Sequence, residues 1–120
     1  MEWKKLCMKE EKFKVIQFIR ELILAVDKEL ENYPKKELEI KNRIRTCTYD
    51  ILEIAYEANV TTDIELKKNL LNKIISKIKV IDFLLNLSYD KKLITEKKYY
   101  KLGQRLDDVI KYVSGWLKKL

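Results

Sequence analysis

Apolar side chains recur every three or four residues through most of this chain of 120 residues, and that interval is the period of an α-helix. The pattern runs in four segments, expected at about residues 10–32, 35–58, 63–88 and 96–118. In the first segment it is carried by Phe13, Ile16, Ile19, Leu22, Val26 and Leu30. Only two glycines and one proline occur in the whole chain, which favours long helices over sheet.

Helix-boundary residues fall at the three breaks in the pattern. Pro34 lacks a backbone N–H, which a first helical turn tolerates and a helix interior does not, so a tight reversal is expected there. Thr62 followed by Glu65 predicts a capping box before the third segment, and Thr95 predicts the N-cap of the fourth. Four segments of similar length joined by short connections predict one all-α domain, residues 1–120, folded as an antiparallel up-down-up-down four-helix bundle.

The cysteines and one glycine are interpreted within this fold. Cys47 lies on the apolar stripe of the second segment and is expected in the core. Cys7 is isolated from it in sequence, so neither a disulfide framework nor a metal-ligand spacing is indicated. Gly103 interrupts the fourth segment, where a close approach of another helix would explain it.

Several function classes are disfavoured by what the sequence lacks. No apolar run approaches the roughly 20 residues needed to cross a bilayer, and no secretory signal pattern occurs, so a soluble, cytoplasmic protein is expected. The chain has no histidine, no GxxxxGK[ST] and no GxGxxG motif. We therefore expect no catalytic residues, no metal and no cofactor, and we expect that the protein is not an enzyme.

Positive charge is concentrated in the second half of the chain. Residues 1–60 carry 12 Lys and Arg against 12 Asp and Glu, whereas residues 61–120 carry 14 against 7. An asymmetric basic charge suggests an anionic partner. Within the helical pattern, basic residues stand in columns one turn apart, and the candidates for nucleic-acid contact are Lys73, Lys77, Lys98, Lys101 and Arg105, followed by Arg43 and Arg45. The alternative for each is a solvated or ion-paired surface residue.

The first and third segments carry more apolar residues than one core stripe needs. The additional residues are Ile23, Leu24, Leu70, Ile75, Val80 and Leu84. They predict either a generously packed core or an interface between identical subunits.

Aromatic residues are frequent, with seven tyrosines among them. Tyr33, Tyr49, Tyr99 and Trp116 are interpreted as core or junction residues. Tyr56, Tyr89, Tyr100 and Tyr112 fall nearer the edges of the apolar stripes, where they could either pack or stack on bases.

Four stretches also resemble a known family. They are YPKKELEIKNRIR (33–45), ILEIAYEAN (51–59), LLNKIISKIKVIDFLLNLSYDKKLIT (70–95) and KKYYKLGQRLDDVIKYVSGWLKK (97–119). In this order they resemble the accessory variability determinant (Avd) proteins of diversity-generating retroelements, within a four-helix-bundle group that includes the ribosomal-RNA intervening-sequence proteins. The resemblance covers about residues 12–119 and leaves the N-terminal residues without an assigned role.

The resemblance implies a barrel-shaped homopentamer of basic four-helix bundles. Such proteins associate with a reverse transcriptase and its structured template RNA, support diversity-generating retrohoming and have no catalytic activity. In this chain the broad apolar faces of the first and third segments would form the subunit contacts, and the excess positive charge would meet RNA. The alternative is a four-helix bundle that binds only proteins and has no nucleic-acid role. A neighbouring reverse transcriptase gene would favour the first hypothesis.

Overall fold

The computed structural model describes the backbone of residues 2–120 and the side chains of residues 12–120. Over this part of the chain it contains four α-helices and one short 3₁₀ turn, and no strand. The elements are α1 (Glu2–Leu30), η1 (Lys35–Glu37), α2 (Leu38–Val60), α3 (Ile64–Asp90) and α4 (Glu96–Lys118). The predicted all-α, antiparallel four-helix bundle is confirmed.

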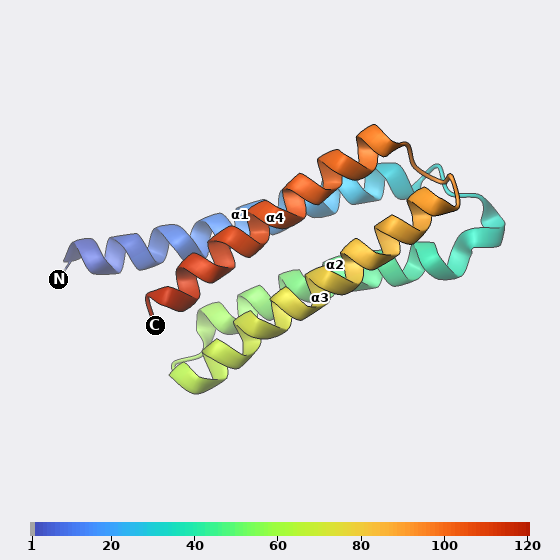
Figure 1. Ribbon diagram of the computed structural model, residues 1–120. Coiled ribbons are helices and arrows are strands. Elements are labelled where there is room, and N and C mark those ends of the chain that lie inside the picture. Colours follow the sequence, from blue (N-terminus) through green and yellow to red (C-terminus); the bar gives the residue numbers. More distant parts are fainter. Residues whose placement is uncertain (1) are drawn as a thin grey trace.

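The helices form a closed cycle in which each one packs against two others. α1 packs against α2, α2 against α3, α3 against α4, and α4 returns to α1 (Figure 1). The bundle therefore has four outer faces, and the α1–α4 face lies opposite the α2–α3 face. Figure 1 also shows that the first part of α1 extends beyond the end of α4. None of the helices, over the part of the chain that is described, is long and apolar enough to cross a membrane.

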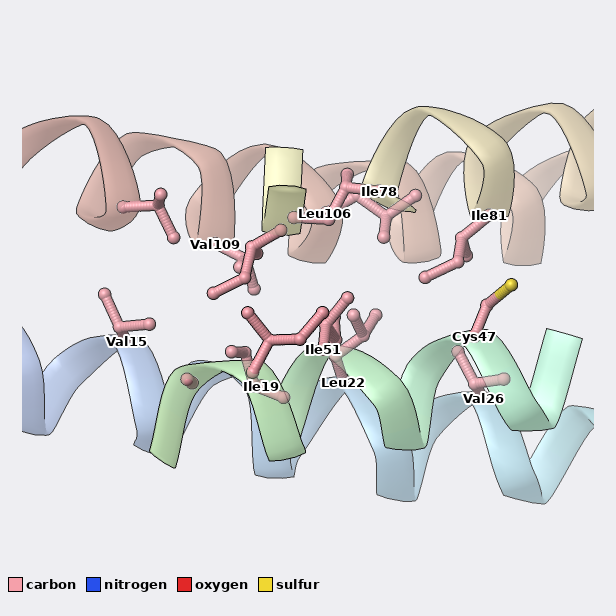
Figure 2. Packing of buried hydrophobic residues seen from close by; sticks show 14 of the residues in the cluster. Val15, Ile19, Leu22, Val26, Cys47, Ile51, Ile78, Ile81, Leu106 and Val109 are labelled. Atoms are coloured by element: carbon pink, nitrogen blue, oxygen red, sulfur yellow. The ribbon is translucent and has the colours of Figure 1, made fainter. Parts of the chain in front are cut away.

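The core lies along the axis of the bundle, where the apolar stripes of all four helices meet. Figure 2 shows Ile19 and Leu22 of α1, Ile51 of α2, and Ile78 of α3 pointing toward one another. Each of these side chains is almost completely buried. Cys47 is a free, buried residue of this core, as predicted. The side chain of Cys7 lies outside the described residues.

The stripe of α1 is rotated slightly from the predicted one. Val15 is fully buried, whereas Phe13 is 68% exposed and Ile16 only half-buried. Val15, Ile19, Leu22 and Val26 are separated by four, three and four residues, which matches the helical period better than a stripe beginning at Phe13. Phe13 follows the predicted spacing but lies outside the core.

The helix boundaries differ from the predicted ones in ways that local chemistry explains. α1 begins at Glu2, not near residue 10, because the apolar stripe marks only the packed part of a helix and says nothing about a turn that extends past its neighbour. Pro34 precedes a 3₁₀ turn, so α2 begins at Leu38. α3 continues to Asp90, two residues beyond the expected end of the third segment at residue 88.

Two side chains cap the later helices. Thr95 accepts a hydrogen bond from the backbone N–H of Lys98 at 3.2 Å, which confirms it as the N-cap of α4. The N-cap of α3 is Asp63, not Thr62: its Oδ1 accepts from the N–H groups of Glu65 and Leu66. A carboxylate in this position also interacts favourably with the positive end of the helix dipole.

Candidate nucleic-acid interface

The α4 candidates for nucleic-acid contact come together in a groove between α1 and α4. Lys98, Lys101 and Arg105 line it from α4, and Lys28 faces them from α1. The groove has a volume of about 670 Å³, and its remaining lining includes two carboxylates, Glu21 and Glu29, with Leu24, Ala25 and Leu102 between them. Four cations against two anions leave this groove with a positive balance.

One of these cations is held in place by an ion pair. Lys98 Nζ lies 3.1 Å from Glu29 Oε2, and the Glu29 side chain is mostly covered while that of Lys98 remains about half exposed. The same two residues also line a smaller cavity of about 340 Å³ at the end of the bundle, together with Lys92 and Thr95. The basic groove therefore continues over the α3–α4 loop, and Glu29 neutralises part of its charge.

Toward the other end of the bundle the same face carries aromatic rings and further lysines. The rings of Phe18 and Tyr112 stack with centroids 4.8 Å apart and an interplanar angle of 10°. The Nζ atoms of Lys14 and Lys111 lie 5.3 and 5.7 Å from the Tyr112 ring centroid. At such distances an ammonium group is attracted to the face of the ring.

One more lysine of α1, Lys12, lies close to an aromatic ring of α4. Lys12 Nζ lies 6.0 Å from the ring of the buried Trp116. We call the surface made by the other cations the α1–α4 face, defined by Lys14, Lys28, Lys98, Lys101, Arg105 and Lys111. This face follows α4 from Lys98 to Lys111. Lys12 itself lies on the core stripe of α1, three residues before Val15, and its charge acts on Lys67 of α3.

The α2 and α3 candidates lie elsewhere on the bundle. Lys77 Nζ is 3.2 Å from Asp50 Oδ2, so it sits on the opposite, α2–α3 face. Lys73, one turn before Lys77, is exposed in the same column. Arg43 precedes Asp50 by two helical turns and therefore belongs to the same side. These residues do not join the α1–α4 face.

Arg45 lies on a third side. Its Nε is 3.5 Å from Asp27 Oδ1, across the contact between α2 and α1. The Tyr49 hydroxyl donates a hydrogen bond of 2.9 Å to the other oxygen of Asp27, and this bond raises the pKa of that tyrosine. Arg45 therefore serves a structural ion pair. The seven predicted residues are split among three faces, and the three residues of α4 are the ones that line a common groove.

The residues that sequence reasoning missed are the lysines of α1. Column spacing within one helix does not connect Lys14 and Lys28 with α4. The signal that could have found them is topological: in an up-down-up-down bundle the last helix returns to the first, and basic residues on both then share one face. Lys67, by contrast, is buried near the start of α3, where desolvation and then the charge of Lys12 lower its pKa.

Some of the predicted core aromatic residues are buried and others are exposed. Tyr33 and Trp116 are buried, as expected, whereas Tyr49 is exposed rather than a core residue. Burial raises the pKa of Tyr33, and the nearby Glu29 charge adds to the effect. Tyr99 is partly buried in the contact between α3 and α4. Tyr56, Tyr89 and Tyr100 are exposed, and Tyr112 is covered in part by Phe18.

The predicted subunit-interface residues differ in how exposed they are. Leu70 is only 8% exposed and belongs to the core of the single chain, which corrects its assignment to an interface. Ile23, Ile75 and Leu84 are half-buried against the same core. Leu24 and Val80 remain 71% and 40% exposed. Phe83, which sequence reasoning passed over, is also exposed.

The described residues thus define a four-helix bundle with a basic groove between α1 and α4 and exposed apolar side chains on α1 and α3. Comparisons with protein-family models, with curated protein sequences and with solved structures find no match.

Proposed function

We propose that this chain is a non-catalytic, oligomeric accessory protein that binds structured RNA and a reverse transcriptase in the cytoplasm. This is the role that the resemblance to Avd proteins implies, in support of diversity-generating retrohoming. The observation that carries the RNA-binding part is the α1–α4 face, where Lys28, Lys98, Lys101 and Arg105 line one groove. Phosphate oxygens are the natural ligands of such a surface, and they require no base-specific motif.

The arrangement favours binding to the phosphate backbone over base reading. The cations lie one after another along α4, so a nucleic-acid strand that runs parallel to this helix contacts several of them. The exposed stacking surface on this face is small, because Tyr112 already stacks on Phe18. The proposed interaction is therefore governed by shape and charge.

Salt dependence tests this proposal directly. If the four groove cations each neutralise one phosphate, the affinity for a structured RNA hairpin should fall by roughly 50- to 150-fold between about 50 and 200 mM monovalent salt. Fluorescence anisotropy with a labelled hairpin measures this change. A flat salt profile, or no detectable binding at the lowest salt, would contradict the proposed RNA interface.

The proposed homo-oligomer, with a pentamer as the expected form, rests on exposed apolar residues, of which Leu24 also lines the basic groove. Leu24 on α1 and Val80 on α3 are exposed apolar side chains on a chain that is otherwise rich in charge. Covering such residues against identical copies would remove apolar surface from water. Five copies of a chain with a net charge of +7 would also concentrate positive charge around the RNA.

We expect the variant Val80→Glu to be monomeric under conditions in which the unmodified protein assembles; Val80 is changed alone because Leu24 also lines the basic groove. A charge buried in an apolar interface without a partner costs several kcal/mol, enough to dissociate a ring of ordinary stability. Light scattering gives the mass of each species. Leu38→Glu is the matched control, because it adds one negative charge at an exposed apolar residue outside the proposed interface. A monomeric wild-type protein would refute the oligomer.

The second candidate function is a protein-binding bundle with no nucleic-acid role. The ion pairs that hold Arg45, Lys77 and Lys98 favour it, because part of the basic charge serves the bundle itself. Absence of RNA binding together with retention of the oligomer would select this candidate.

A further inference from the structure

A second groove lies on the α3–α4 face and differs from the basic one in chemistry. Tyrosines 89, 99 and 100 line it together with the carboxylates of Asp82, Glu96 and Asp107. Lys97 is the single cation in this lining, so the groove is negative in a chain whose net charge is +7. Its volume is about 800 Å³.

The tyrosine side chains are held in fixed positions. The Tyr99 hydroxyl donates to Asp82 Oδ1 at 3.3 Å and accepts from Asn86 Nδ2 at 3.1 Å. Its ring stacks on that of Tyr89, with centroids 5.7 Å apart and an interplanar angle of 13°. Tyr100 is 67% exposed, and its hydroxyl accepts from Gln104 Nε2. The groove thus presents ordered aromatic surfaces next to carboxylates.

Gly103 lines the same groove. A Cβ added to it would meet no atom within 4 Å, so no neighbouring helix requires a glycine here. The expected close helix approach at Gly103 was wrong. Glycine in a helix interior costs about 1 kcal/mol relative to alanine. Packing does not require a glycine here, and no glycine of the described chain has a positive φ, so neither packing nor backbone conformation accounts for this cost. What the glycine does provide is open space in the groove.

The groove is elongated along the two helices. A second cavity of about 250 Å³ shares Asp82, Gly103 and Asp107 with it, continues toward Ile110 and adds one cation, Lys79, so that three carboxylates still face two lysines over both cavities. From Glu96 to Ile110 the α4 axis rises by about 21 Å, which an extended peptide covers with about six residues. A side chain at position 103 would stand at the junction of the two cavities.

From these features we propose that the α3–α4 groove binds an extended, arginine-rich segment of a protein partner. Guanidinium groups stack on aromatic rings and form paired hydrogen bonds with carboxylates, and this groove offers both surfaces side by side. Most of the basic surface repels such a segment, so the negative groove determines where it binds. The proposal concerns a different face from the RNA interface and stands even if the α1–α4 face binds no RNA.

A labelled hexa-arginine peptide is the probe for this groove, with binding followed by fluorescence anisotropy at low salt. The groove variant Asp82→Asn/Asp107→Asn removes two carboxylates, and Gly103→Gln fills the junction of the cavities. We expect each to weaken peptide binding about tenfold or more. The matched control Glu53→Gln/Glu57→Gln removes the same charge from exposed positions of α2 and should change affinity less than about twofold.

Three results would overturn the proposal. Equal weakening by the groove variant and its α2 control would mean that only net charge matters. Unchanged peptide binding by a folded Gly103→Gln protein would place the peptide elsewhere, with Gly103→Ala, which fits the open space, as the reference for folding. Displacement of the peptide by spermidine at equal concentration would identify a free polyamine as the ligand.

Discussion

Replacing Trp116 with alanine should destabilise the bundle more than any other single truncation in α4. Trp116 is fully buried and is the largest of the completely covered side chains. Truncating a buried tryptophan costs about 3–5 kcal/mol, from lost apolar burial and from the cavity that remains. For a domain of this size about 1 kcal/mol corresponds to roughly 4 °C, so the Tm should fall by about 12–20 °C. Thermal unfolding followed by circular dichroism measures the change.

Trp116→Phe is the control for this prediction. The indole Nε1 is buried and has no hydrogen-bond acceptor among the described residues, so phenylalanine removes a polar atom that gains nothing from burial. We therefore expect a loss of only about 1 kcal/mol, mainly from the smaller ring. A Trp116→Ala protein that melts within about 5 °C of the wild type would show that this end of the bundle is not packed as described.

The triple variant Lys98→Gln/Lys101→Gln/Arg105→Gln should reduce RNA affinity by about 100- to 1,000-fold at low salt. Each cation that contacts a phosphate contributes on the order of 1 kcal/mol under these conditions, and all three line one groove. The helical circular dichroism spectrum should be unchanged, because these side chains are exposed and only Lys98 has an ion-pair partner, Glu29. The readouts are anisotropy with a labelled hairpin and its salt slope.

The matched control for the RNA prediction is Arg43→Gln/Lys73→Gln/Lys77→Gln. It removes the same three charges from the opposite side of the bundle, where Lys77 pairs with Asp50. If the α1–α4 face is the interface, this control should lose less than about tenfold and keep most of the salt slope. Equal losses in the two triple variants would show that RNA responds only to net charge, and a greater loss in the control would move the interface to α2 and α3.

The fold was predictable because one physical constraint dominates it. Four amphipathic segments joined by short connections have few ways to bury their stripes, and residues such as Ile19, Ile51 and Ile78 fall where the helical period places them. The errors concern positions at the edge of an apolar stripe or at the end of a helix, which this constraint does not determine. Phe13 satisfies the spacing of the stripe but lies on its edge, and Thr62 resembles a cap although the next residue, Asp63, provides it.

The candidate site was predictable only in part, because a surface depends on which helices are neighbours. Lys98, Lys101 and Arg105 could be grouped within α4, but their partner Lys28 belongs to a helix some 70 residues earlier. Ion pairs such as Arg45 with Asp27 also depend on side-chain geometry across a helix contact, which sequence spacing does not contain. The tyrosine and carboxylate groove had no sequence signal, since it forms only where Asp82 and Tyr89 of α3 lie beside the lining residues of α4.

The up-and-down path of the chain places both termini at one end of the bundle (Figure 1). The α3–α4 connection, with Glu96 and Tyr89 close to it, lies at the other end. A fluorescent protein, affinity tag or immobilisation linker attached at either terminus would therefore project away from the mouth of the tyrosine groove. Labelled fusions of this protein can serve in pull-down and imaging work without masking that surface.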